Sequence, residues 1–116
     1  MLLRASGDQS GAEIDLNAVI GAAEGDGGIP NGALLGQFAA AAIGNDEIAL
    51  ASIRSEILEV LGPAALVDTA AIVSTFNAID RIADSTGIPI DEVRLAPTAD
   101  LRDQLGINDF PSRAGP

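Results

Sequence analysis

The sequence contains no cysteine, histidine, lysine, tryptophan or tyrosine among its 116 residues. The lack of cysteine excludes disulfides, thiolate nucleophiles and thiol peroxidase chemistry by this chain's own side chains. Without cysteine and histidine, the usual zinc and redox-metal ligand sets are also excluded. Serine–histidine triads and Schiff-base lysines are excluded for the same reason. Carboxylates, arginine, hydroxyls and backbone amides remain as the reactive groups of the chain. We expect no cofactor. We also expect no metal, because the acidic residues follow no EF-hand spacing.

Long hydrophobic runs are missing as well. The amino-terminal MLLRASGDQ lacks the apolar stretch of a signal peptide. No other run approaches the roughly 18 apolar residues that a membrane span needs. We therefore expect a soluble, cytoplasmic protein that makes no use of a membrane.

Basic charge is scarce. Seventeen acidic residues stand against six arginines, which gives a net charge of −11. This balance disfavours binding to nucleic acid through phosphate neutralisation, and binding to anionic membranes for the same reason. The acidic residues are spread along the chain, as in a solvated surface.

Aromatic residues make up only 3% of the chain, although 47% of it is hydrophobic. The core must therefore be built from alanine, leucine, isoleucine and valine. Small side chains bury little area each, at about 25 cal/mol per Å², so a single copy gains little from its own core. We expect a homo-oligomer.

Apolar residues at helical spacing predict an all-α fold, a single-domain helical bundle of about five helices arranged around a long central helix. The central helix is Pro63–Gly87, because proline suits the first helical position and glycine can take the left-handed conformation that ends a helix. The other helices are predicted near residues 12–25, Asn31–Ile43, Asp46–Leu61 and Ala99–Leu105, with Asn31, Asn45 or Asp46, and Thr98 as candidate caps.

The remaining segments are predicted to be irregular. Residues 1–11 are polar and are expected to be loosely ordered, and residues 107–116 form a tail in which Phe110 can anchor to a neighbouring helix or subunit. The glycine-rich GDGGIPNG, residues 25–32, is predicted to be a turn, since it matches no phosphate-binding spacing.

The central helix has two faces that begin apolar, of which the second ends in polar and charged residues. Spacings of four, three, four and three place Ile72, Phe76, Ile79, Ala83 and Thr86 on one face. The other face carries Leu66, Ala70, Val73, Asn77, Asp80 and Asp84. The first face is apolar throughout, and we expect this helix to be a core element.

The polar end of the central helix holds the candidate site. Asn77 lies one turn before Arg81, and Asp80 and Asp84 sit together one step around the helix. One interpretation is an ion-pair network that fixes helix packing or a subunit contact. The other is a catalytic site, in which Asp80 or Asp84 acts as general acid or base, while Asn77 and Arg81 bind a small anionic ligand.

Part of this helix also resembles a known family. The run ALVDTAAIVSTFNAIDRIADSTGIP is similar to the carboxy-terminal helix of the carboxymuconolactone decarboxylase and alkylhydroperoxidase-D-like superfamily, in its peroxidase-related branch. The residues that carry the match are Phe76, Asn77, Arg81, Ala83, Asp84, Thr86, Gly87 and Pro89. The preceding SEILEVLGPAALVD and the later LRDQLGINDF also fit, so the resemblance covers about residues 33–110.

The resemblance implies an all-helical protein that assembles as a trimer or hexamer. It also implies a Cys-x-x-Cys or Cys-x-x-x-His redox motif, which this sequence lacks entirely. Our leading hypothesis is therefore a divergent or truncated member without thiol redox chemistry, acting as an oligomeric structural or binding module. Two alternatives are a cofactor-free lyase or isomerase acting on a small acid, and a fragment completed by a partner chain that carries the cysteines.

Overall fold

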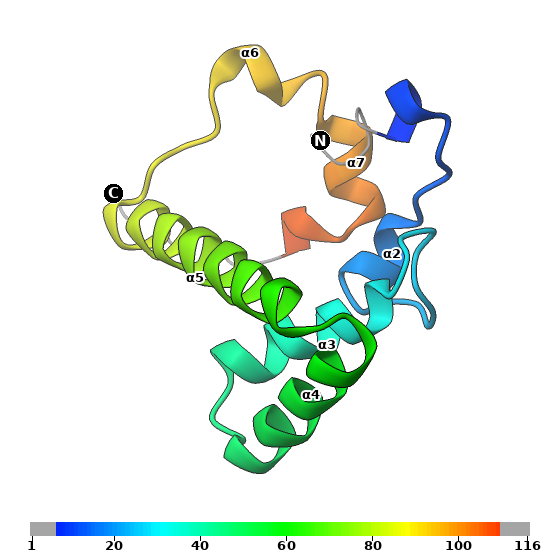
Figure 1. Ribbon diagram of the computed structural model, residues 1–116. Helices are drawn as coiled ribbons and strands as arrows, with labels where there is room; N and C mark the ends of the chain where they lie inside the picture. The colour runs from blue at the N-terminus through cyan, green and yellow to red at the C-terminus, as the bar shows by residue number, and fades with distance from the viewer. Residues whose placement is uncertain (1–6, 110–116) are drawn as a thin grey trace.

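The computed structural model describes residues 7–109 and confirms the all-α prediction, with no strand in that range (Figure 1). Residues 7–10 are helical, although a loosely ordered segment was expected there. The predictions for residues 1–6 and for Phe110 and the residues after it lie outside the described range. The helices are α2 (Leu16–Val19), α3 (Gly32–Ile43), α4 (Glu47–Val60), α5 (Pro63–Thr86), α6 (Glu92–Leu95) and α7 (Ala99–Gln104), followed by a 3-10 turn at Ile107–Asp109.

Local sequence explains where α4 and α5 begin. The Asp46 side chain caps α4, because its Oδ1 accepts the backbone N–H groups of Ile48 at 3.1 Å and Ala49 at 2.9 Å. These are donors that a helix start leaves without an internal partner. Gly62 has a positive φ of 86°, and Pro63 follows it at the first position of α5. The short connection folds α5 back beside α4.

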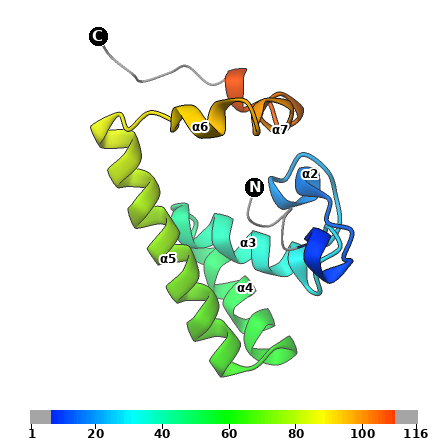
Figure 2. The same ribbon diagram turned by 90° about the horizontal axis from the view of Figure 1, so that it is seen from above.

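The packed part of the molecule consists of α3, α4 and α5, which contact one another, while α2 lies on α3. Only three hydrophobic side chains among residues 7–109 are buried, Phe38 on α3, Ile57 on α4 and Leu101 on α7. Figure 2 shows α3 and α4 beside the amino-terminal half of α5, whose carboxyl half continues beyond them. The structure is consequently open, and its radius of gyration of 15.9 Å exceeds the about 13 Å of a compact domain of similar length.

The prediction that α5 is a core helix was wrong. None of its residues is buried. The side that packs is the one with Leu66, Ala70, Val73 and Asn77, all half-buried. A second side, about 120° around the helix, carries Ile72, Phe76 and Ile79 and is exposed. Both sides are apolar near the helix start, and α3 and α4 occupy the one that continues into polar residues.

The first predicted helix is much shorter than residues 12–25. Asp15 caps α2 through a bond from the Asn17 N–H at 2.9 Å, and the helix ends at Val19. Gly21 follows with a φ of 75°, a left-handed conformation that interrupts a helix. The glycine-rich stretch after it is a turn, as predicted. There the backbone passes so close to Glu13 that a Cβ on Gly28 would lie 2.0 Å from the Glu13 carbonyl oxygen.

Two predicted caps do not act as caps. Asn31 has a left-handed φ of 57° and makes no side-chain bond to α3. Its place is taken by Asp26, whose Oδ1 accepts the Ala33 N–H at 2.9 Å. Thr98 precedes α7, but its hydroxyl donates to the Arg94 carbonyl at 2.7 Å. The hydroxyl also accepts a hydrogen bond from Arg102 Nη1 on α7, so it links the two helices and does not cap α7.

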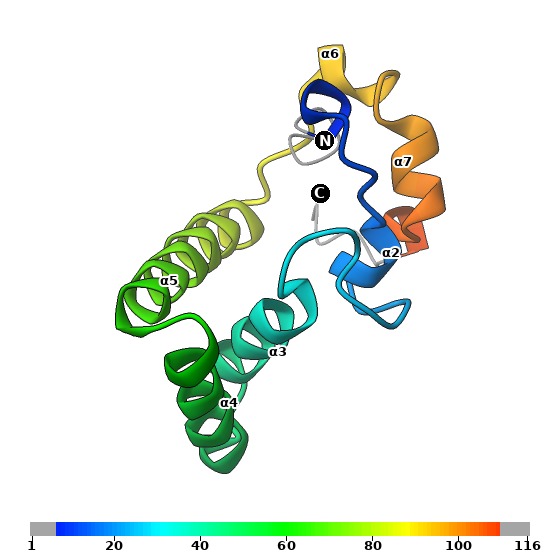
Figure 3. The same ribbon diagram turned by 45° about the vertical axis from the view of Figure 1, so that its right-hand side comes forward.

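The carboxyl-terminal helices lie apart from the three packed helices. Figure 3 shows α5 and α7 on opposite sides of the molecule, with α6 in the connection between them. Arg102 on α7 ties this junction together, because Nη1 donates to the Leu95 carbonyl at 3.0 Å and Nε donates to Asn108 Oδ1 at 3.3 Å. The segment 88–98 connects α5 to α7 and contains no long helix, as its two prolines predict.

Candidate functional site

The predicted polar cluster lies on the carboxyl half of α5. Asn77 is half-buried, whereas Asp80, Arg81 and Asp84 are exposed. They are neighbours by helix geometry, since three- and four-residue spacings share a face. None of the three charged residues lines any of the three hollows described between residues 7 and 109. Their catalytic or binding role stays a prediction, and no enclosing wall supports it.

One hollow lies where α3, α4 and α5 meet. Its volume is about 380 Å³, and its walls are apolar apart from Arg54 on α4. The wall residues are Phe38, Ala42, Leu50, Arg54, Leu66, Val67 and Ala70. Arg54 is exposed, so its charge stands at the edge of an apolar hollow. Sequence reasoning missed this arrangement, because only the packing of three helices brings these positions together.

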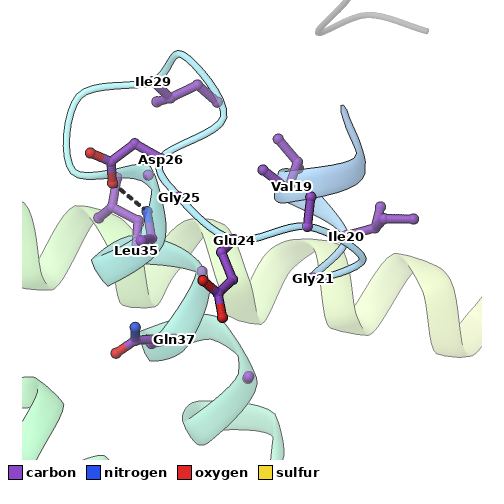
Figure 4. A pocket seen from close by; sticks show the side chains of 15 residues that line it. Val19, Ile20, Gly21, Glu24, Gly25, Asp26, Ile29, Leu35 and Gln37 are labelled. Atoms are coloured by element: carbon purple, nitrogen blue, oxygen red, sulfur yellow. Dashed lines mark hydrogen bonds between the residues drawn. The ribbon is translucent and has the colours of Figure 1, made fainter. Parts of the chain in front are cut away.

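A larger hollow, of about 800 Å³, lies between α2, the loop after it and α3. Figure 4 shows Val19 and Ile20 on one side of it and Leu35 and Gln37 on α3 on the other. Its two carboxylates have different surroundings. Asp26 accepts the Ala33 N–H (dashed in Figure 4), whereas Glu24 extends from the loop toward α3. Apart from the Gln37 amide, the polar side chains of this hollow are acidic, and no cationic side chain lines it to attract an anion.

Metal and membrane features are also absent from the part of the chain that the structure describes. Between residues 7 and 109, no three acidic side chains gather closely enough to hold a metal ion. No helix in that range has both the length and the apolar character to cross a membrane. Every buried side-chain nitrogen or oxygen there has a hydrogen-bond partner, so no orphaned polar group indicates a missing ligand.

Comparison with protein-family models, curated proteins and solved structures found no match.

The most distinctive surface is the exposed side of the second half of α5. We call the α5 face the set of Ile72, Thr75, Phe76, Ile79, Ile82, Ala83 and Thr86, all of them exposed except the half-buried Ala83. Its four large side chains are each 54–61% exposed. Exposed hydrophobic residues are ordinary when scattered, but a contiguous set marks an interaction surface. The spacing in the sequence placed Ile72, Phe76, Ile79, Ala83 and Thr86 on one face but did not include Thr75 or Ile82, and the expectation that this face lies in the core was wrong.

The α5 face contains no charged residue. Between Thr69 and Gly87 the only charged residues are Asp80, Arg81 and Asp84. At 3.6 residues per turn, Asp80 borders the face while Arg81 and Asp84 lie farther around the helix. A chain with 20% charged residues thus keeps one helix face free of them, and depletion of charge is the compositional mark of an interface core.

The hydroxyls of the α5 face are already satisfied within the helix. Thr75 Oγ1 donates to the Ala71 carbonyl at 2.8 Å, and Thr86 Oγ1 donates to the Ile82 carbonyl at 2.6 Å. A hydroxyl with a partner inside its own helix can be buried without the penalty of an unmade hydrogen bond. The α5 face can therefore be covered by an apolar partner at little cost in polar desolvation.

Proposed function

We propose that this chain is an oligomeric structural or binding module, resembling the carboxy-terminal part of the carboxymuconolactone decarboxylase and alkylhydroperoxidase-D-like superfamily but without thiol redox chemistry. The sequence supports the lack of thiol redox chemistry, because the chain has no cysteine to oxidise. The resemblance in Phe76, Asn77, Arg81 and the residues around Gly87 supports the family part. The function that follows is association, with catalysis left to other chains.

The observation that carries the proposal is the imbalance between buried and exposed hydrophobic side chains. Three are buried among the described residues, whereas sixteen large ones are exposed. Full burial of such a side chain is worth about 1.5–3 kcal/mol, so one copy leaves a large part of its available hydrophobic stabilisation unused. Association of copies is the direct way to bury it, since homo-oligomers with closed symmetry are the commonest assemblies.

The fold supports a binding role more than a catalytic one. The charged candidates Asp80, Arg81 and Asp84 are exposed on a helix that extends beyond α3 and α4 (Figure 2). Catalytic acids and bases need surroundings that exclude water and tune their protonation. An exposed helix side supplies neither, whereas it is well placed to meet another chain.

Sedimentation velocity of the full chain between about 1 µM and 1 mM, a range that brackets interfaces of modest area, tests the association. We expect a mass that is a multiple of 11.7 kDa and that decreases on dilution. A single-chain mass at every concentration would contradict the proposal. The redox part is tested separately with a hydroperoxide and dithiothreitol, where turnover above the protein-free rate would contradict it.

A further inference from the structure

We propose that the α5 face is a contact between two copies of this chain, which pack as antiparallel helices around a twofold axis close to Ile79. This inference rests on the proposed function, because it names the surface and the partner for the association. It goes further in assigning the arrangement of the helices and the residues that meet. Antiparallel pairing about Ile79 places Ile72 opposite Thr86 of the partner copy and Phe76 opposite its Ile82.

The spacing of the face matches the packing of paired helices. Ile72, Phe76, Ile79, Ala83 and Thr86 alternate at four and three residues, which is the repeat of the seam between two coiled helices. The seam runs over fifteen residues, from Ile72 to Thr86, and is therefore about 21 Å long. About an axis at Ile79 the residues of the α5 face pair among themselves, as Ile72 with Thr86, Thr75 with Ala83 and Phe76 with Ile82, so the face is complementary to itself.

The exposed area is sufficient for a weak contact between copies. A large apolar residue carries on the order of 200 Å² of surface, and Ile72, Phe76, Ile79 and Ile82 are each 54–61% exposed. Complete burial of these four side chains in two copies would remove about 900–1,000 Å² from water, which is the size of a small and weak protein interface.

Net charge disfavours anionic partners and directs basic partners away from the α5 face. The chain carries a net charge of −11, so an anionic membrane or a nucleic acid is repelled, and a basic protein would be drawn to the acidic surfaces outside the face. The face itself is uncharged and apolar, and every other copy of this chain carries the same uncharged, apolar face. Like net charge weakens their approach, which makes the association dependent on salt.

The position of the other helices favours the antiparallel direction. The α3 and α4 helices pack beside the amino-terminal half of α5 (Figure 2). Antiparallel pairing of the carboxyl halves puts the two acidic α4 helices at opposite ends of the pair, whereas parallel pairing would place them side by side. Antiparallel pairing also points the two helix dipoles in opposite directions, which is favourable. A twofold contact gives even-numbered assemblies, so it fits a hexamer and does not by itself give a trimer.

Cysteine crosslinking tests this arrangement without interference, because the chain has no cysteine of its own. Under mild oxidation we expect Ile79→Cys to form covalent dimers rapidly, since a residue on the axis meets its own copy within disulfide reach. Ile72→Cys and Thr86→Cys should crosslink when mixed and only slowly when each is alone. Rapid crosslinking of each alone would show parallel helices, and equal rates for all samples would show random collision. Either result overturns the inference.

A pair of charge substitutions provides the matched control. Phe76→Glu adds one charge inside the face, and Ile48→Glu adds the same charge at an exposed position on α4 outside it. Like charges brought together across an interface cost several kcal/mol, so we expect Phe76→Glu to weaken association by about 100-fold or more and Ile48→Glu to change it less than threefold. Far-ultraviolet circular dichroism should show unchanged helix content in both.

The outcomes separate the inference from the proposed function. If the wild-type chain associates and Phe76→Glu associates equally well, another surface is the interface, and the inference is overturned while the proposed function stands. If the wild-type chain is a single copy at every concentration, both are overturned. An odd-numbered wild-type assembly that Phe76→Glu leaves intact likewise overturns the twofold contact alone.

Discussion

Among truncations of a hydrophobic side chain in the packed part of the molecule, Ile57→Ala should lower the free energy of unfolding the most. Ile57 lies on α4, which packs against α3 and α5, and its side chain is 0% exposed. The change removes three carbon groups, worth about 2.4 kcal/mol in transfer free energy at about 0.8 kcal/mol each. A residual cavity adds a further 1–2 kcal/mol or so. We therefore expect the free energy of unfolding to decrease by about 3–4 kcal/mol.

The assay is urea unfolding followed by circular dichroism at one fixed chain concentration, because association also stabilises the folded state. With an m-value of about 1–3 kcal/mol per molar urea, the midpoint should decrease by roughly 1–4 M. Ile48→Ala is the matched control, since Ile48 is on the same helix and 84% exposed, and it should change the free energy by less than about 0.5 kcal/mol. Equal losses from both variants would refute the assignment of Ile57 as the centre of packing.

Three further predictions follow from local geometry. Asp46→Ala removes the cap of α4 and should lower the free energy of unfolding by about 1 kcal/mol, whereas Asp46→Asn should retain most of it, as measured by thermal unfolding. Gly28→Ala should destabilise by well over 1 kcal/mol, because φ is 79° and the new Cβ would meet the Glu13 carbonyl. Gly36→Ala on α3, where nothing lies within 4 Å, should stabilise by up to about 1 kcal/mol, and equal signs for the two glycines would contradict the backbone described. Arg81→Ala should change the free energy of unfolding by less than about 0.5 kcal/mol, because Arg81 is exposed; a collapse of the fold would show instead that its ion pairs hold the helices together.

Helix positions were largely predictable because their signals are local. Pro63 and Gly87 mark the ends of α5, and Gly87 has the left-handed φ of 67° that its position predicts. Asp46 was recognisable as a cap because carboxylates at a helix start accept the first backbone N–H groups. The first predicted helix failed at Gly21, where a positive φ outweighed the apolar spacing on either side.

The direction in which α5 packs could not be read from the sequence. Periodicity shows which residues share a face, but it does not show which face meets a neighbour. Leu66, Ala70 and Val73 offered one apolar side, and Ile72, Phe76 and Ile79 offered another. Only the placement of α3 and α4 decides between them. For the same reason, the hollow edged by Arg54 and the exposure of Asp80 and Arg81 became visible only in the folded chain.

Whether a second copy covers the α5 face is measured most directly by nuclear Overhauser effects between copies, in a mixture of isotope-labelled and unlabelled chain. Covering of this face by a second copy predicts cross-peaks between the Phe76 ring of one copy and the Ile82 methyl groups of the other, and between the two Ile79 side chains. These peaks should disappear on dilution below the association midpoint. A concentrated sample without any contact between copies at Phe76 or Ile79 would contradict the account.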